Sequence, residues 1–213
     1  MRRLTVTDTL IHITATRTAQ GDVHVAGAVI AADAGEHPDA DVIDGRGAAT
    51  VPLYAETVLA PPFSADAATF DLVPGNPATF AVIEGAVRSE QIRHMLVVSP
   101  RALRAVVVDG TLVARNGEPS RATGTDALAT EDPRLGAWTD AGRDMTQFLT
   151  RDGRYSETRG GRRDAYTGRF WLDGDRITYL DDTGFWAFGQ YVGGVLHHAG
   201  FVLRRDAAAS AHP

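Results

Sequence analysis

Turn signals divide the stretch from Arg151 to Arg205 into runs of about 8–12 residues, the spacing of a β-meander or a small barrel. The signals all contain glycine: Asp152-Gly153, Gly160-Gly161, Asp173-Gly174, Asp182 to Gly184 and Gly193-Gly194. The runs between them are aromatic and favour strands, yet Arg, Glu, Asp and His recur at alternating positions. Alternation places one set of side chains inside a barrel, so some of these polar groups must line the interior. A small barrel with a polar interior is expected to hold a ligand.

The composition is that of a globular protein with an acidic balance. The chain has 213 residues and a net charge of -6, which disfavours a nucleic-acid partner. No segment approaches the ~20 apolar residues of a membrane span, and no apolar run follows the two arginines near the start. We therefore expect a cytoplasmic protein that binds neither nucleic acid nor membrane.

Two residue types are missing from the sequence, and each absence excludes a class of chemistry. There is no Cys, and all 21 basic residues are Arg. These absences exclude disulfides, thiol nucleophiles, thiolate metal ligands, a Schiff-base lysine and a GK[ST] phosphate loop. His12, His24, His37 and His94 also lack the spacing of metal ligands. We expect neither a metal nor a cofactor.

The aromatic residues divide the chain into two parts. All three Trp, four of the five Tyr and five of the eight Phe lie between residues 135 and 205. The segment from Asn116 to Arg134 is rich in Gly, Pro, Ser and Thr and has no apolar period, as expected of a linker. The sequence predicts an N-terminal domain over residues 1–119, a linker over 120–134, a barrel over 135–205 and a disordered tail over 206–213.

The N-terminal part also consists of short β-type runs between Gly and Asp turns. Its strongest signal is a hairpin from Leu103 to Arg115, because Asp109-Gly110 suits a type I′ turn. Only residues 88–97 show helical spacing, with Ile92 and Leu96 on one side. The chain as a whole is predicted to be all-β.

A family resemblance rests on two segments of the N-terminal part. The first is TLIHITATRTAQGDVHVAGAVIAADAGEHPDADVIDGRGAATVP, and the second is PGNPATFAVIEG followed by LRAVVVDGTLVARNGEP. They resemble the opening and closing parts of amidohydrolase-superfamily enzymes, which form a small β-sandwich beside a metal-binding barrel. Here Leu53 replaces the family's glycine and no HxH metal pair follows. About twenty residues separate the segments, far fewer than the ~250 of a TIM barrel. The resemblance implies a sandwich remnant whose barrel is deleted near residues 53–71, without the metal chemistry.

Four segments carry a second resemblance: GAWT, DGRYSETRGGRRDAYTGRF, GDRITYLDDTGFWAFG and VLHHAGFVLRR. They resemble a bacterial family of small, uncharacterised β-barrels described as streptavidin-like or lipocalin-like, over about Leu135 to Arg205. The resemblance implies an antiparallel barrel with a ligand pocket, and it implies no reaction. The predicted fold is thus an amidohydrolase-type sandwich remnant followed by this barrel.

Tyr155, Glu157 and Arg159 alternate along one predicted strand and therefore share a face. A buried Glu beside a buried Arg is tolerated only when the two are paired. One interpretation is a pocket wall, in which Arg159 orients an anionic or carbonyl group and Glu157 accepts a proton. The other is a solvent-facing ion pair. We predict the pocket, because the opposite face of the strand is an equally good exterior.

Asp181 and His198 are two further candidates for acid–base chemistry. Asp181 and Asp182 are neighbours whose pKa values can separate, although Asp before Thr-Gly is also ordinary turn chemistry. His197 and His198 lie in the apolar run VLHHAGFVL and must face opposite ways. We choose His198 as the inward one, either a proton shuttle or a satisfied core residue. The predicted catalytic residues are Glu157, His198 and Asp181.

Aromatic and basic side chains complete the predicted site. Trp138 is the preferred pocket aromatic, Tyr166 is expected to point inward, and Arg163 is expected at the barrel mouth. The predicted ligand-binding residues are Trp138, Tyr155, Arg159, Arg163, Tyr166 and Tyr179.

The sequence contains no HExxH or GxSxG motif. We expect a biosynthetic or metabolic enzyme that uses acid–base residues, without metal or redox cofactor, to isomerise, cyclise, dehydrate or hydrolyse a small polar-aromatic molecule. A homodimer or a partner enzyme fits this function. The alternative is a non-catalytic ligand-binding or accessory protein whose sandwich docks a partner.

Overall fold

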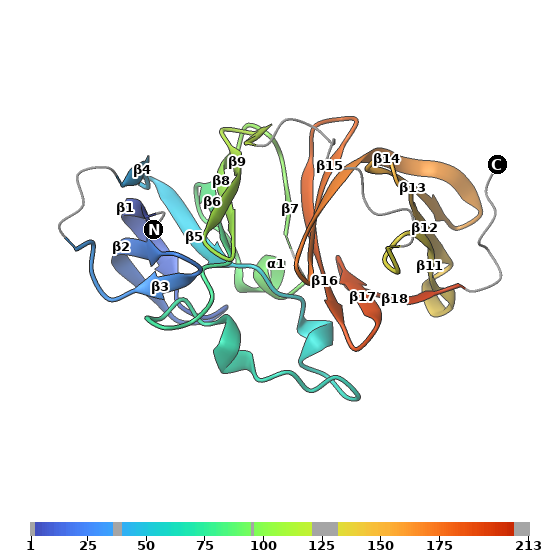
Figure 1. Ribbon diagram of the computed structural model, residues 1–213, viewed down its shortest axis with the longest axis horizontal. Helices are drawn as coiled ribbons and strands as arrows, with labels where there is room; N and C mark the ends of the chain where they lie inside the picture. Colours follow the sequence, from blue (N-terminus) through green and yellow to red (C-terminus); the bar gives the residue numbers. More distant parts are fainter. Residues whose placement is uncertain (1–2, 36–39, 95, 121–131, 207–213) are drawn as a thin grey trace.

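The computed structural model describes residues 3–35, 40–94, 96–120 and 132–206, which form two sheets of nine strands each (Figure 1). The first sheet has the strand order β10-β9-β8-β6-β5-β1-β2-β3, and β4 pairs with β1 in parallel. Its strands are β1 (Arg3–His12), β2 (Thr18–Ala26), β3 (Val29–Ala31), β4 (Asp41–Asp44), β5 (Ala48–Pro52), β6 (Phe80–Glu84), β8 (Leu103–Val108), β9 (Thr111–Arg115) and β10 (Glu118–Pro119).

The second sheet closes into an antiparallel barrel of eight consecutive strands, because β15 pairs with β16 and β11 pairs with β18. The barrel strands are β11 (Gly136–Asp140), β12 (Met145–Leu149), β13 (Arg154–Arg159), β14 (Arg162–Asp173), β15 (Arg176–Asp181), β16 (Trp186–Val192), β17 (Val195–His198) and β18 (Phe201–Arg205). The ninth strand, β7 (Val97–Val98), comes from the N-terminal part and pairs with β16. The all-β prediction is confirmed.

Helical structure is scarce within the described ranges. They contain one α-helix, α1 (Ser89–Arg93), and the 3₁₀ turns η1 (Glu56–Val58), η2 (Ala67–Phe70) and η3 (Ala141–Arg143). The helix expected over residues 88–97 is therefore too long. The chain leaves the helix at His94 and becomes extended at Val97, where pairing with β16 replaces helical hydrogen bonds.

The central strands of the first sheet are buried on both faces. In β6, Phe80 and Val82 join one apolar cluster with the outer strands, whereas Ala81 and Ile83 join a second cluster with α1 and the barrel wall. β5 and β8 alternate in the same way. A strand covered on both faces carries a continuous apolar run, which explains the sequence of these strands.

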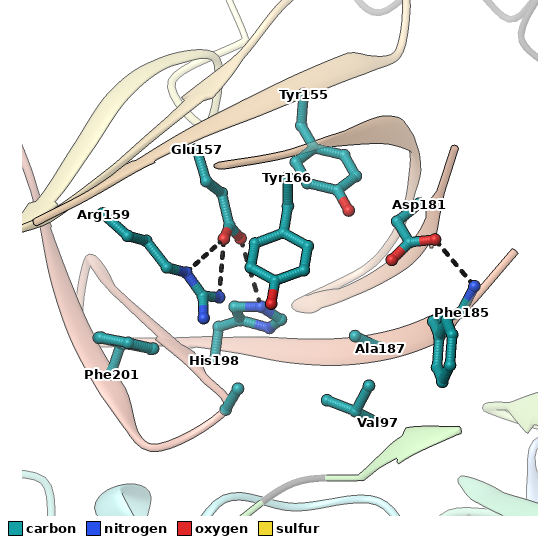
Figure 2. A pocket seen from close by; sticks show the side chains of 11 residues that line it. Val97, Tyr155, Glu157, Arg159, Tyr166, Asp181, Phe185, Ala187, His198 and Phe201 are labelled. Atoms are coloured by element: carbon teal, nitrogen blue, oxygen red, sulfur yellow. Dashed lines mark hydrogen bonds and ion pairs between the residues drawn. The ribbon is translucent and has the colours of Figure 1, made fainter. Parts of the chain in front are cut away.

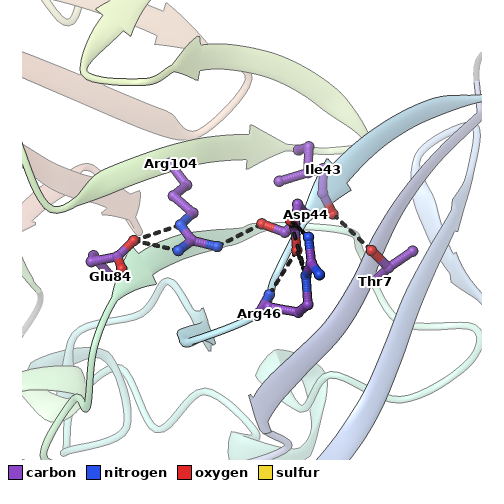
Figure 3. A network of polar contacts seen from close by, with 6 residues as sticks. All are labelled: Thr7, Ile43, Asp44, Arg46, Glu84 and Arg104. Carbon is purple, nitrogen blue, oxygen red and sulfur yellow. Dashed lines mark hydrogen bonds and ion pairs between the residues drawn. The ribbon is translucent and has the colours of Figure 1, made fainter.

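A polar network fixes the turn that joins β4 to β5 (Figure 3). The Arg104 guanidinium donates to the Glu84 carboxylate at 2.6 Å and to the Asp44 carbonyl at 2.7 Å. Gly45 passes so close to β1 that a Cβ there would lie 2.4 Å from the Thr7 carbonyl oxygen. This close approach to β1 explains the glycine at position 45 of the IDGRG segment.

The two parts of the chain share a hydrophobic core. Leu180, Trp186 and Phe188 on the outer face of the barrel belong to the same buried cluster as Ile83 and Ile92. The Trp186 indole also donates to the Gly117 carbonyl at 3.1 Å. Figure 1 shows the barrel beside β8, β9 and α1 in this arrangement.

Residues 53–71, where the amidohydrolase resemblance places a deleted barrel, form a loop that contacts the C-terminal barrel. The Arg176 guanidinium donates to the Leu53 carbonyl at 2.7 Å. His197 faces out of the barrel, with Nδ1 2.8 Å from the Thr57 hydroxyl and its ring 4.5 Å from the edge-on Phe63 ring. His197 is therefore a contact between the two parts of the chain.

The predicted turns fall where the strands end. All five glycine signals of residues 151–205 lie between consecutive barrel strands, and Asp109 and Gly110 both have positive φ, as a type I′ turn requires. VLHHAGFVL is two strands, however, because Ala199 and Gly200 take φ values of 47° and 82° and form a turn. Most of the predicted linker and tail, residues 121–131 and 207–213, lies outside the described residues, and the domain boundaries remain a prediction.

His197 generates a prediction about pH. Burial lowers its pKa from 6.5 to about 4. Between those values the unfolded chain binds a proton that the folded chain does not, so stability present above pH 6.5 is lost as the pH falls toward 4. The melting temperature of the His197→Asn variant should therefore depend less on pH between 6.5 and 4 than that of the wild type. If the melting temperatures of the wild type and the variant changed equally with pH across this range, the assignment would be contradicted.

Candidate functional site

A pocket of about 160 Å³ opens at one end of the barrel, and we call it the mouth pocket (Figure 2). Its polar lining comes from three barrel strands, β13, β15 and β17, and consists of Tyr155, Glu157, Arg159, Asp181 and His198. Its apolar and aromatic lining consists of Val97, Tyr166, Phe185, Ala187, Ala199 and Phe201. An aromatic rim therefore surrounds a charged floor.

Glu157 lies at the centre of the floor and is only 2% exposed. Its Oε1 accepts a hydrogen bond from the Gln147 amide at 2.8 Å, and its Oε2 accepts from Arg159 Nε at 2.8 Å. Arg159 Nη2 lies 2.7 Å from the same Oε2. Behind Gln147, the Tyr179 hydroxyl donates to the Gln147 side-chain oxygen at 2.7 Å. The buried negative charge is thus paired and hydrogen-bonded, as its burial requires.

His198 reaches the floor from the opposite wall, at the end of β17. Its Nδ1 lies 2.8 Å from the Phe188 carbonyl oxygen, and a carbonyl can only accept, so Nδ1 carries the hydrogen. Burial lowers the pKa of His198, although Glu157 nearby opposes that shift. The neutral ring therefore presents the lone pair of Nε2 toward the pocket, 3.7 Å from Glu157 Oε1. That nitrogen is available as a hydrogen-bond and proton acceptor.

Arg159 is held between two aromatic rings at the edge of the pocket. Its guanidinium lies 4.6 Å from the centre of the Tyr166 ring and 5.0 Å from that of Phe201. Cation–π contacts and the Glu157 ion pair fix its position together. Arg159 therefore neutralises Glu157 and stiffens the aromatic rim.

Two further polar groups face the mouth pocket. The Tyr155 hydroxyl makes no hydrogen bond to any described residue, and it points into the space between Glu157 and Asp181 in Figure 2. Burial raises the pKa of Tyr155, so the hydroxyl keeps its hydrogen. Asp181 Oδ1 accepts from the Thr183 and Phe185 amides at 2.8 and 2.9 Å, which is the turn chemistry expected of it. Asp181 therefore caps a turn and also lines the pocket.

Strand alternation explains how these side chains meet. Tyr155 and Glu157 on β13 point inward, as do Gln147 on β12 and Tyr179 on β15. The turn at Ala199-Gly200 ends β17 directly after His198 and so places this residue at the mouth. The alternative of a solvent-facing ion pair for Glu157 and Arg159 is wrong, because the Glu157 carboxylate is buried.

Three predicted site residues do not line the mouth pocket. Trp138 is buried in the barrel interior, where its indole donates to the Arg134 carbonyl at 2.8 Å. Tyr179 lies behind the floor, with its ring 4.6 Å from that of His198. Arg163 is exposed, and it lies beside an irregularity of β14 at Asp164, which has a φ of 50°.

Sequence reasoning missed Gln147, Phe185, Phe201 and Val97. Gln147 shares its inward face with Met145 and Leu149, so strand alternation could have identified it as a buried polar residue. Phe185 and Phe201 each follow a glycine turn, a weak signal for a rim position. Nothing local marks Val97, whose strand partner Ala187 is distant in the sequence.

The described residues contain no group of three His, Cys, Asp or Glu side chains placed to hold a metal ion. Within the same ranges, every helix is too short or too polar to cross a membrane.

Arg159 and Arg154 offer a matched test of the buried charge. Both lie on β13 and pair with a carboxylate, but Glu157 is buried whereas the Asp182 side chain is 48% exposed. Arg159→Met leaves a buried charge unpaired and should lower the free energy of unfolding by about 3 kcal/mol. Arg154→Met should lower it by less than about 1 kcal/mol. Glu157→Gln added to Arg159→Met should restore most of the loss in urea denaturation; equal losses in the two single variants would contradict the account.

Comparison with known proteins finds a similarity in the barrel region. Residues 131–205 match the model of a family described as Agrobacterium tumefaciens protein Atu4866. A solved structure, the solution structure of the protein Atu4866 from Agrobacterium tumefaciens, is 43% identical over 35% of this chain and 96% of that chain, with a TM-score of 0.32. No curated protein matches the chain, and no comparison supports the amidohydrolase resemblance. The C-terminal region, which contains the eight-stranded barrel, thus matches a family whose description states no activity.

Proposed function

We propose that the barrel binds a small, flat molecule with a hydroxyl head in the mouth pocket, and that His198 accepts a proton from this molecule. The protein would then be an acid–base enzyme whose reaction starts with proton removal, such as an isomerase, cyclase, dehydratase or hydrolase. The observation that carries the proposal is the orientation of His198, whose Nε2 faces the pocket while the Phe188 carbonyl holds Nδ1–H.

The size of the pocket supports a ligand head no larger than one ring. Its volume is about 160 Å³. A dry protein cavity of about 150 Å³ is large enough for a benzene molecule. The rings of Tyr155, Tyr166, Phe185 and Phe201 supply flat walls for such a head. Phenols and compact enols have this size and shape.

The polarity of the floor supports a head that donates a hydrogen bond. His198 Nε2, the Glu157 carboxylate and the Asp181 carboxylate are all acceptors. An anionic head would meet two carboxylates, whereas a hydroxyl could donate to His198. Apolar walls with a few convergent polar groups are typical of small-molecule sites.

Glu157 supports His198 in this proposal and does not act as the base. Its oxygens already accept hydrogen bonds from Gln147 and Arg159, so we assign the role of proton acceptor to His198 Nε2, which faces the pocket. When His198 takes a proton, the carboxylate 3.7 Å away stabilises the imidazolium. The Tyr155 hydroxyl can donate to the oxygen left on the ligand, and the proton then returns to another atom of the ligand.

The architecture adds support at the level of the fold. Eight-stranded up-and-down barrels include lipocalins and streptavidin, which hold small ligands inside. We also propose that the barrel is related to streptavidin or the lipocalins, that the first sheet has an amidohydrolase origin, and that the protein has a metabolic or biosynthetic role. We further propose a homodimer or a partner enzyme, and a cytoplasmic location, with which the absence of Cys agrees.

A binding protein without catalysis is the second candidate. The observation that favours it is the rigidity of the floor, since Glu157 and Arg159 are paired and Arg159 is held between two rings.

Deuterium exchange distinguishes the acid–base enzyme from the binding protein. A ligand retained by the purified protein, identified by native mass spectrometry, should exchange carbon-bound hydrogen with D₂O faster in the presence of wild-type protein. His198→Asn should slow that exchange by ~10²-fold or more; binding with no exchange would favour the second candidate.

Binding of phenol tests the site itself. His198→Asn keeps a donor for the Phe188 carbonyl but removes the Nε2 acceptor, and should weaken phenol binding by about tenfold or more, since an unmade hydrogen bond costs ~1–3 kcal/mol. His197→Asn is the matched control: it changes the adjacent residue on the opposite face and should leave phenol affinity unchanged. Titration followed by NMR gives both affinities. Equal affinity in wild type and His198→Asn would overturn the assignment.

A further inference from the structure

The mouth pocket is completed by a residue from outside the barrel. Val97 of β7 pairs with Ala187 of β16, and both residues line the pocket. The next residue, Val98, points the other way and is buried in the shared core with Trp186. Val98 therefore anchors the strand, and the anchor fixes Val97 at the rim.

Exposed hydrophobic side chains gather at the rim of the mouth pocket. The described residues include five large hydrophobic side chains that are exposed, and three of them, Val97, Tyr166 and Phe185, line the mouth pocket. Their exposed fractions are 57%, 48% and 43%. Single exposed apolar residues are common, but a group around a pocket indicates an interaction site.

A second cavity begins at Val97 and extends along α1. It measures about 320 Å³ and is lined by Arg88, Glu90, Gln91, His94, Leu96 and Val97. His94 Nδ1 would lie 3.5 Å from a Cβ on Gly200, so this groove also adjoins the turn that forms the pocket rim. Val97 lines both cavities, so the two cavities adjoin each other at this residue.

We propose that the N-terminal part is the specificity element of the barrel site: Val97 selects ligands whose apolar body extends from the hydroxyl head, out of the mouth pocket and over β7, toward the groove beside α1. The substrate class is a hydroxylated ring or enol with an aliphatic extension and a polar end, since Arg88, Gln91 and His94 in the groove can hydrogen-bond. This inference rests on the proposed function, because it assumes that the head occupies the mouth pocket.

The test compares phenol with 4-propylphenol as NMR titration probes. Wild-type protein should bind 4-propylphenol at least tenfold more tightly than phenol, because the propyl group covers Val97 and Phe185. Val97→Asp should abolish that preference, so that the two probes bind the variant with equal affinity. Val42→Asp is the matched control, since Val42 is 55% exposed on β4 of the other sheet, and it should keep the preference.

The outcomes separate the two proposals. If wild type binds neither probe, the proposed function fails and this inference fails with it. If phenol binds and His198→Asn weakens it, but Val97→Asp keeps the full preference for 4-propylphenol, only the specificity assignment is overturned. Val97→Ala, which adds no charge to the strand, should reduce the preference as well, so a misfolded Val97→Asp variant does not decide the result.

Discussion

The carboxylate of Glu157 is a charge buried inside a small barrel, and the surrounding residues are arranged to satisfy it. Gln147 and Arg159 hydrogen-bond to it, Tyr179 orients Gln147, and His198 faces it at 3.7 Å. An isolated buried carboxylate would be strongly destabilising, whereas a paired one is tolerated. The network therefore constrains the inward positions of four strands, and it leaves His198 Nε2 as the acceptor that faces the pocket.

The N-terminal part matters to this site although it contributes no charged group to the floor. Its central strands are covered on both faces, by their own outer strands on one side and by the barrel wall on the other. The same packing carries β7 to the edge of the mouth pocket. A wall residue from outside the barrel gives the chain a means to change ligand choice without changing the floor, because Val97 lies on β7 and the Glu157 network lies on barrel strands.

Much of the barrel could be predicted from local rules. Glycine turns marked the strand ends, and alternation placed Tyr155 and Glu157 on one inward face. Local rules failed where the backbone departs from regular alternation. β14 is irregular near Asp164, and the turn at Ala199-Gly200 divides a run that looked like one strand. They also could not show that Val97 would pair with Ala187, ninety residues further along the chain. Such long-range pairing depends on the whole fold.

The protonation of His198 tests the account most directly. Long-range ¹H–¹⁵N NMR spectra distinguish the two nitrogens of each imidazole ring, and His198→Asn assigns the signals. At pH 7 the account predicts a neutral ring with the hydrogen on Nδ1, and a shift of the Nε2 signal when phenol is added. A ring with the hydrogen on Nε2, or an Nε2 signal that phenol leaves unchanged, would contradict the claim that His198 is the proton acceptor of a ligand site.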